Sequence, residues 1–357
     1  MSNLQRTREE LANKNIKAFL VNDIESVCWL TGFTGSAGIV LLTPNGGRFI
    51  TDSRYTIQAK EQVSGLDVVT FDTTSDRLGF ISGNAREMGI ETLSFDGTKM
   101  TYAMVDNLAK KLDGIHFASV DDPIAGLRMI KSPEEIDKIR AACKLADACL
   151  EHVVRLIQPG VSEYSINLEV EFFYRRHGAA LAFEPIVVSG PNSARPHGKA
   201  TEKLLENGDF VTIDCGAELD GYCSDITRTF VVGKASDRHR EVYEQVLKAE
   251  KAAIDAARPG ITGKELDAVA RDLLGTAGLA EYFGHGLGHG LGRLVHDGGA
   301  LNPSSQTVLA PGQVWTIEPG AYIEGFGGVR IEDDVVITSS GCEVLTFFPK
   351  ELLELPG

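Results

Sequence analysis

The chain has 357 residues, with 50 acidic and 35 basic side chains and a net charge of −15 at pH 7. This length exceeds that of most single cores and favours two domains. Hydrophobic residues make up 43% and charged residues 24% of the sequence, which excludes a largely disordered protein. The acidic balance, without a local basic patch, argues against nucleic acid or an anionic membrane as a partner and favours a small substrate.

The beginning of the chain predicts an amphipathic helix rather than a targeting segment. Residues 1–19 lack the apolar core of a signal peptide, and no later stretch approaches 18 uninterrupted apolar residues. The six cysteines are scattered without Cys-x-x-Cys spacing, which favours free thiols. We therefore expect a cytoplasmic protein that does not associate with membranes.

The first third of the chain alternates short apolar runs with helical stretches, which predicts an α/β layer. The apolar runs are residues 18–21, 38–42, 48–51 and 92–95. A capping box at Ser132-Pro133-Glu134-Glu135, with proline at the first helical position, then predicts a long helix that ends at Pro159-Gly160. We place the domain boundary before this helix, which gives domains of residues 1–124 and 125–357.

The second domain contains an internal repeat with a spacing of one hundred residues. "QPGVSEYSINLEVEFFYRRHG" begins at Gln158 and "RPGITGKELDAVARDLLGTAG" begins at Arg258. Downstream, "GDFVTID" ends at Asp214 and "GQVWTIE" ends at Glu318, each with glycine six residues before the acid. Two half-domains of helices followed by strands predict a pseudo-twofold axis, with the two acids facing each other across it.

Each of these acids begins a predicted hairpin that carries a second acid. Asp220-Gly221 is a hairpin turn signal after Asp214. A two-residue loop would place Asp214 opposite Thr227 and diagonal to Asp225, whereas a four-residue loop would place it directly opposite Asp225. In both cases the two carboxylates share one face with Thr227, and such like charges destabilise a sheet unless a cation separates them.

The second half of the repeat carries a similar hairpin, whose glycine-rich loop lies near residue 325. Glu318 lies on one strand and Glu332 on the other, with Arg330 on the same face as Glu332. Solvated or lysine-paired acids are the alternative, but the flanking runs are apolar and the hairpins bring few cations. Four carboxylates from two symmetric hairpins therefore favour a metal site.

A glycine-rich run, "FGHGLGHGLGRLVHDGG" at residues 283–299, supplies three histidines. The five alternating glycines exclude a stable helix and let an extended segment pass close to other backbone. In a strand His285 and His289 would lie about 13 Å apart, so only one of them can bind a given ion. The spacing does not match a phosphate-binding loop, and we interpret the run as part of a metal cleft.

Taken together, these residues resemble the creatinase/aminopeptidase family of "pita-bread" metallopeptidases, and in particular its proline-specific branch. "DCGAELDGYCSDITRTF" resembles the two-aspartate motif of the family, "GHGLGHGLGRLVHD" its histidine motif, and "TIEPG" and "GGVRIEDDV" its glutamate motifs. The likeness continues at "SGPNSARPHGKAT", "KSPEEIDKIR", "TGFTGSAG" and "FITDSRYTIQA". It implies an α+β fold: a pita-bread catalytic domain with an internal pseudo-twofold, preceded by a smaller α/β creatinase-like N-terminal domain.

The resemblance also implies a dinuclear metal centre and a proline-specific peptidase activity. Its ligands would be Asp214, Asp225, His289, Glu318 and Glu332. Two divalent ions would bind there, with Mn²⁺ best suited to this oxygen-rich set and Co²⁺ or Zn²⁺ as alternatives. A hydroxide bridging the ions would attack the carbonyl of an N-terminal Xaa-Pro bond, and Glu318 would transfer the proton.

The remaining site residues are carried over by the same resemblance. His296 and His197 would hydrogen-bond the oxyanion or the substrate backbone. His285 and Phe183 would line the proline pocket. Arg330, together with Thr227 on the shared strand face, would orient a carboxylate ligand. A structural role is the alternative for the three histidines. The family often dimerises through its N-terminal domain, so a homodimer is expected.

The expected substrate length depends on whether the chain has a cation for the carboxylate of a dipeptide. Prolidases typically carry an arginine shortly after the last histidine to bind the dipeptide carboxylate, but "VHDGGAL" follows His296 here. We therefore expect an Xaa-Pro aminopeptidase, with a prolidase as the alternative. In the prolidase, the loops of residues 31–38 and 51–55 could supply the cation through Arg54, within one chain or across a dimer. The complete ligand set argues against a creatinase-type amidinohydrolase and against a non-catalytic pita-bread interaction protein.

Overall fold

The computed structural model describes residues 1–357 and divides them into two compact units, Met1–Arg128 and Met129–Gly357. The boundary expected from the sequence, between residues 124 and 125, lies four residues before this division. Helix α6 (Ala125–Met129) occupies the intervening segment, and within it Arg128 donates a hydrogen bond to Ser26 Oγ at 3.2 Å. This contact connects α6, up to Arg128, with the first unit.

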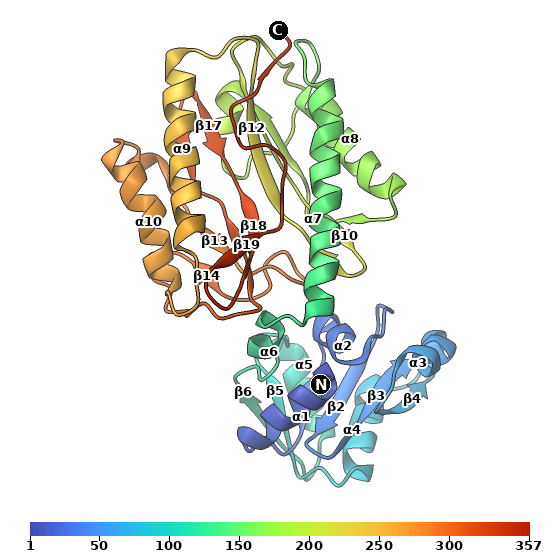
Figure 1. Ribbon diagram of the computed structural model, residues 1–357. Coiled ribbons are helices and arrows are strands. Elements are labelled where there is room, and N and C mark those ends of the chain that lie inside the picture. The colour runs from blue at the N-terminus through green and yellow to red at the C-terminus, as the bar shows by residue number, and fades with distance from the viewer. The chain divides into compact units, whose positions relative to one another are not determined.

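The first unit is built on a six-stranded mixed sheet in the order β4-β3-β2-β1-β5-β6 (Figure 1). Its strands are β1 (Phe19–Val21), β2 (Ile39–Thr43), β3 (Gly46–Asp52), β4 (Asp67–Phe71), β5 (Thr92–Asp96) and β6 (His116–Val120). Its other helices are α1 (Asn3–Asn13), α2 (Ile24–Thr31), α3 (Thr56–Gln62), α4 (Arg77–Glu87) and α5 (Tyr102–Lys111). All four apolar runs identified in the sequence form strands.

Both faces of this sheet are covered, because alternate residues of its central strands enter two separate cores. Phe19, Val40 and Phe49 pack with residues of α1, α2 and α3. Leu20, Leu41 and Ile50 point to the opposite face and pack with residues of α4 and α5. The period-two alternation of strand side chains therefore produces the α/β layers predicted from the sequence.

The second unit consists of two half-domains with the same order of helices and strands. The first contains α7 (Pro133–Val153), α8 (Glu163–Arg176), β7 (Ala180–Leu181), β8 (Ile186–Ser189), β9 (Phe210–Cys215), β10 (Ala217–Leu219), β11 (Tyr222–Cys223) and β12 (Ile226–Val232). The second contains α9 (Asp237–Ala256), α10 (Gly263–Thr276), β13 (Gly288–His289), β14 (Ala300–Leu301), β15 (Val314–Ile317), β16 (Gly320–Ile323), β17 (Gly327–Arg330), β18 (Asp333–Ile337) and β19 (Cys342–Val344), and β20 (Glu354–Leu355) follows. None of the helices in the chain has the length and apolarity that a membrane span requires.

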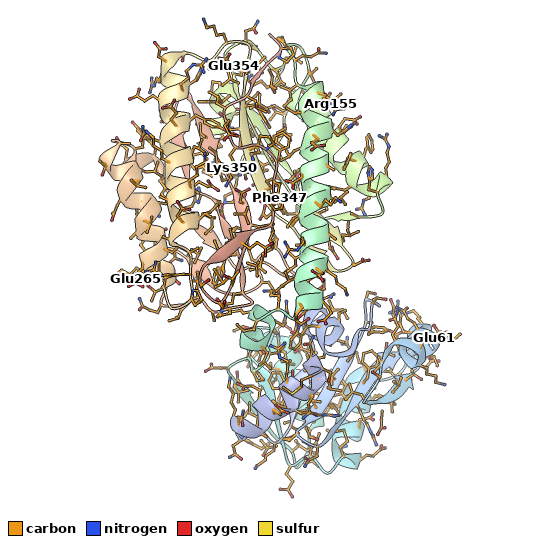
Figure 2. All side chains as sticks on the ribbon, viewed as in Figure 1. Glu61, Arg155, Glu265, Phe347, Lys350 and Glu354 are labelled. Atoms are coloured by element: carbon orange, nitrogen blue, oxygen red, sulfur yellow. The ribbon has the colours of Figure 1, made fainter.

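The internal repeat predicted from the sequence is confirmed by matching hydrogen bonds. Ser162 caps α8 and Thr262 caps α10, in the latter case with a full capping box that includes Glu265, labelled in Figure 2. The turn before α8 bonds from Gly160 N to Leu205 O at 3.0 Å, and the turn before α10 bonds from Gly260 N to Leu309 O at 2.9 Å. Figure 1 shows α7 with α8 and α9 with α10 on opposite sides of the strands.

A buried group of charged side chains connects the two half-domains with the C-terminal segment. Arg228 on β12 forms an ion pair with Asp333 on β18 at 2.8 Å, and both side chains are at most 1% exposed. Lys350, on the C-terminal segment labelled in Figure 2, forms ion pairs with Asp333 and with Glu250 of α9. Arg228 also donates to the carbonyl oxygens of Glu332 and Phe348, at 2.5 and 2.7 Å.

Removing one member of this group should destabilise the second unit strongly. Arg228→Met would leave Asp333 buried without its arginine, which typically costs about 3–5 kcal/mol. Urea unfolding in the presence of EDTA measures the loss, with the buried Trp315 as the fluorescent probe in a Trp29→Phe background.

The matched control is Arg140→Met, which removes an ion pair with Glu343 whose side chains are 38% and 50% exposed. Exposed pairs contribute below about 1 kcal/mol, so this variant should unfold close to the parent. If Arg228→Met and Arg140→Met lost the same free energy of unfolding, the burial of the Arg228–Asp333 ion pair would have no special role in stability.

Candidate metal centre

The first hairpin has the shorter of the two loops that the sequence allowed. Strand β9 pairs with β12 in the register that places Asp214 opposite Thr227. Asp220 and Gly221 both have positive φ, 51° and 73°, as a two-residue turn of the Asp-Gly type requires. Asp225, one residue before β12, is therefore diagonal to Asp214.

The second hairpin repeats this geometry in two short pieces. Strands β15 and β18 pair Ile317 with Asp333, and β16 and β17 pair Gly320 with Arg330. Both pairs belong to one register, so Glu318 and Glu332 face each other in the gap between the pieces. The loop turns at Gly325, near the position expected from the sequence.

The glycine-rich run crosses this hairpin at van der Waals distance. A Cβ atom at Gly288 would lie 2.1 Å from the carbonyl oxygen of Thr316 on β15, and Gly290 forms an isolated bridge with Trp315 on the same strand. Only glycine permits such an approach. His289 N donates to Thr316 Oγ1 at 3.0 Å, which holds the histidine beside the end of β15.

All five expected ligand residues come together at the centre of the second unit. Carboxylate oxygens of Asp214, Asp225 and Glu332 lie within 4.8 Å of one another. His289 Nε2 lies 3.6 Å from an oxygen of Asp225 and 3.6 Å from an oxygen of Glu318. The two hairpins and the glycine-rich run each contribute to this cluster.

The cluster contains buried carboxylate oxygens without partners and carboxyl groups with raised pKa values, as expected of side chains that bind a cation. Asp214 Oδ1 and Asp225 Oδ1 are buried without any hydrogen-bond partner. Burial, followed by the charges of Glu332 and Asp214, raises the pKa of Asp225 well above its usual range. Burial likewise raises the pKa of Glu318 to about 8, and burial with the neighbouring His296 lowers the pKa of His289 to about 4.

A site of this kind fits divalent cations. Unpartnered buried carboxylate oxygens are costly, and a cation is the group that satisfies them while cancelling their repulsion. The neutral imidazole of His289 is the form that binds metal. Four carboxylates with one imidazole form a donor set without sulfur, which suits ions that prefer oxygen ligands.

Arg330 and Thr227 orient the carboxylates of Asp214 and Glu332 by hydrogen bonds. Arg330 donates to Asp214 Oδ2 at 2.6 Å and to Thr227 Oγ1 at 3.0 Å. Thr227 in turn donates to Glu332 Oε2 at 2.6 Å. These bonds occupy one oxygen of Asp214 and one of Glu332, so the other oxygen of each is left for a cation.

A cavity of about 300 Å³ opens onto the cluster. All five expected ligands line it, and so do His197, His296 and Phe183. His296 meets His289 edge to face, with ring centroids 4.0 Å apart. Apolar side chains of Pro185, Ile186 and Val295 form further parts of the wall.

His285, which we expected to line the proline pocket, is not among the residues that line this cavity. Its Nε2 lies 2.9 Å from Tyr322 Oη and its Nδ1 lies 2.8 Å from Gly286 O. Tyr322 Oη also accepts from Arg330 at 2.8 Å. His285 therefore connects to the cluster through Tyr322 and Arg330.

Sequence reasoning missed Tyr322, Asp334 and Lys199. Asp334 Oδ2 accepts from the backbone N of Asp225 at 2.9 Å and from Cys143 Sγ at 3.3 Å. The signal for Asp334 was present as the acid pair after Glu332. For Tyr322 no sequence signal was available, since its hydroxyl contacts His285, 37 positions away in the chain. Lys199 lies within the quoted motif "SGPNSARPHGKAT", in which we assigned no role to this lysine.

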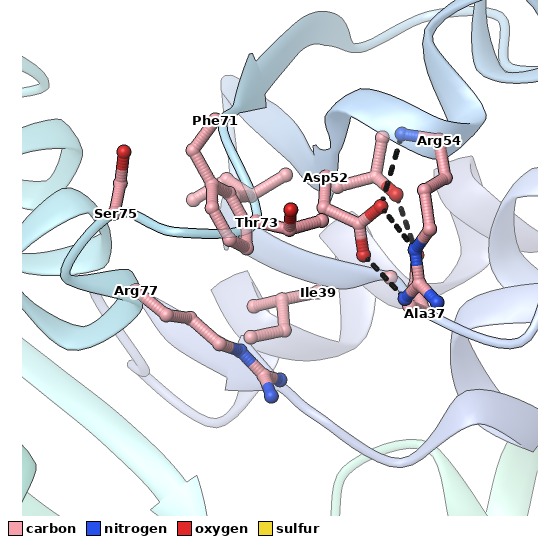
Figure 3. Close-up of a pocket in the computed structure, with 11 residues that line it drawn as sticks. Ala37, Ile39, Asp52, Arg54, Phe71, Thr73, Ser75 and Arg77 are labelled. Atoms are coloured by element: carbon pink, nitrogen blue, oxygen red, sulfur yellow. Dashed lines mark hydrogen bonds and ion pairs between the residues drawn. The ribbon is translucent and has the colours of Figure 1, made fainter.

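Arg54, the alternative cation in the first unit, borders a separate cavity of about 240 Å³ (Figure 3). Its Nε and Nη2 donate to the two carboxylate oxygens of Asp52 at 2.9 and 2.8 Å. The arginine side chain is nonetheless 64% exposed. Asp52 thus orients the guanidinium group while leaving much of it in solvent.

Comparison with known proteins identifies the class to which this fold and site belong. Residues 137–339 match metallopeptidase family M24, and residues 3–130 match the creatinase/prolidase N-terminal domain. The chain therefore belongs to metallopeptidase family M24 and has the creatinase-like domain followed by the pita-bread domain. It is a metal-dependent hydrolase, and family membership implies divalent metal ions at its site.

Individual relatives bear names from both proline-specific groups. The Xaa-Pro dipeptidase of Pyrococcus furiosus is 46% identical over 264 residues, 74% of this chain and 76% of that protein. An Xaa-Pro dipeptidase from Bacillus anthracis is 42% identical, with a TM-score of 0.95 over 99% of both chains. An X-Pro aminopeptidase from Thermotoga maritima is 37% identical, with a TM-score of 0.90 over 97% of this chain and 100% of that one.

Neutralising one acid of the cluster should raise the melting temperature of the metal-free protein and reduce the further increase that a metal ion produces. Asp225→Asn removes one of the mutually repelling charges, so the melting temperature in EDTA should rise by about 2–4 °C. The same change removes an anionic oxygen, so added Mn²⁺ should raise the melting temperature much less than in the parent. Calorimetry with and without Mn²⁺ measures both effects.

Asp220→Asn is the matched control, because Asp220 lies in the exposed hairpin turn and asparagine tolerates its positive φ. This variant should keep the full response to Mn²⁺. A full response in Asp225→Asn as well would contradict a metal-binding role for Asp225.

Proposed function

We propose that this chain is an Xaa-Pro dipeptidase that uses two divalent metal ions, Mn²⁺ in particular. The observation that carries the proposal is the single cavity that contains the five candidate ligands together with His197, His296 and apolar walls. Relatives named as Xaa-Pro dipeptidases support the choice of substrate. They favour this alternative over the aminopeptidase that we expected from the sequence.

In this proposal Asp214, Asp225, His289, Glu318 and Glu332 would together hold the ions, since their ligand atoms converge at one end of the cavity. Bound divalent ions supply Lewis acidity at the scissile carbonyl and lower the pKa of a nearby water.

The residues of the chain itself perform the remaining tasks. Glu318 would accept a proton from the water that attacks the scissile carbonyl. It would return this proton to the proline nitrogen as the C–N bond breaks, because the nitrogen of a tertiary amide has no N–H of its own. Thr316 Oγ1 donates to Glu318 Oε1 at 3.2 Å and so fixes the carboxylate for this transfer. His296 and His197, on the cavity wall, would hydrogen-bond the oxyanion and the substrate backbone.

Proline specificity would depend on the apolar part of the cavity wall. Phe183, Pro185 and Ile186 are adjacent in sequence or nearly so and offer apolar surface for the ring. His285 would support this region indirectly through Tyr322. We also propose a homodimer located in the cytoplasm, as the sequence led us to expect.

An Xaa-Pro aminopeptidase is the second candidate function. The similarity to the Thermotoga maritima X-Pro aminopeptidase favours it, and so does the lack of an arginine shortly after His296. A creatinase-type amidinohydrolase or a non-catalytic pita-bread protein would be favoured only if the purified protein took up no metal from Mn²⁺, which elemental analysis measures.

Matched substrates of different length separate the two peptidases. With Mn²⁺ present, we expect a higher kcat/KM for Ala-Pro than for Ala-Pro-Ala-Ala, because a dipeptide site holds the carboxylate that the longer peptide lacks at that position. Proline release measured under initial-rate conditions gives the value for the dipeptide, and release of the N-terminal alanine gives the value for the longer peptide. Preference for the longer peptide would establish the aminopeptidase instead.

Replacing His296 tests the proposed stabilisation of the oxyanion. His296→Ala should lower kcat on Ala-Pro by about 10²–10³-fold, the typical effect of losing one such donor, while leaving the bound Mn²⁺ unchanged. His239→Ala provides a control, since His239 caps α9 and does not line the cavity. Loss of Mn²⁺ together with activity in the His296 variant would make this histidine structural.

A further inference from the structure

A dipeptide presents a negative charge where a longer peptide presents a neutral amide, so a dipeptidase needs a cation at that place. No arginine follows His296 until Arg330. The guanidinium group of Arg330 is already committed, because it donates to Asp214, Thr227 and Tyr322 and to the carbonyl oxygen of Pro196 at 3.3 Å. It cannot bind the substrate without giving up its bond to Asp214 or to one of these neighbours.

Among the residues that line the cavity, Lys199 is the only lysine or arginine. It follows His197 by two residues, and its side chain is 77% exposed. Its Nζ lies 2.9 Å from Glu184 Oε2, and Glu184 also lines the cavity, with its side chain 69% exposed. The ion pair therefore lies at the open side of the cavity, away from the buried metal ligands.

We propose that Lys199 binds the C-terminal carboxylate of the substrate and thereby determines the preference for dipeptides, an inference that rests on the proposed dipeptidase function. Glu184 is then the resident counter-ion that the substrate carboxylate replaces. Exposed ion pairs are weak, so exchanging one carboxylate for another on Lys199 is a small change. Adjacent Phe183 and Pro185 place apolar surface beside this cation, as a C-terminal proline requires.

The length of the substrate determines whether its carboxylate meets Lys199. Each further residue moves the C-terminus by up to about 3.3–3.6 Å along an extended chain. In Ala-Pro-Ala-Ala the carboxylate would lie two residues beyond the dipeptide position, and a neutral peptide group would face Lys199. The lysine therefore favours dipeptides without any contact to the scissile bond.

The test compares Ala-Pro with its neutral analogue Ala-Pro-amide, with Mn²⁺ present, in the wild type and in Lys199→Met. We expect Lys199→Met to raise KM for Ala-Pro about tenfold, equivalent to one charged contact, with little change in kcat. KM for the amide should stay unchanged. Lys199→Arg should retain the preference for Ala-Pro, and Glu184→Gln should lower KM for Ala-Pro because the competing carboxylate is removed.

Lys264→Met is the control, since Lys264 is an exposed lysine at the start of α10 and does not line the cavity. Unchanged KM for Ala-Pro in Lys199→Met would overturn the inference, and a raised KM in Arg54→Met would then identify Arg54 as the anchor. If the wild type itself fails to cleave Ala-Pro, the proposed dipeptidase function is wrong. If the wild type cleaves Ala-Pro and Lys199→Met has the same KM for it, only the role of Lys199 is contradicted.

Discussion

The mutual repulsion of four carboxylates in one buried place is the constraint on which the second unit depends. Asp214, Asp225 and Glu332 bring oxygens within 4.8 Å of one another, and two of these residues have buried oxygens without a partner. The protein itself offsets only part of this charge, through Arg330 and the hydroxyl of Thr227. Cations would relieve this repulsion, and the chain belongs to a metallopeptidase family.

The duplicated architecture explains how a chain can assemble such a site. Each half-domain ends a buried strand with an acid and returns along the hairpin with another, so the acids converge because the halves face each other. Behind them, Arg228 and Lys350 neutralise Asp333 and tie both halves to the C-terminal segment. The charges nearest the cavity are left for ligands, while those behind it are paired within the protein.

Much of this site was predictable because its residues belong to local patterns. The hairpin turn at Asp220-Gly221 and the period-two alternation of strands were enough to place Asp214, Asp225 and Thr227 on one face. The cavity wall was less predictable. His285 follows the same sequence pattern as His289, yet it contacts Tyr322 rather than the cavity, because the path of an irregular glycine-rich segment depends on the strands that it crosses.

The sequence by itself determined the α/β layer, the internal repeat, the helix starts and the acids of the candidate metal centre, since each is specified by spacing within a short segment or by comparison of two such segments. Only the tertiary structure decided which basic side chains are hydrogen-bonded to the acids of the cluster and which one lines the cavity. Arg330 is engaged with Asp214, whereas Lys199 reaches the cavity from the loop after His197. Such contacts join residues more than one hundred positions apart, or depend on side-chain exposure, and neither property is encoded in local periodicity.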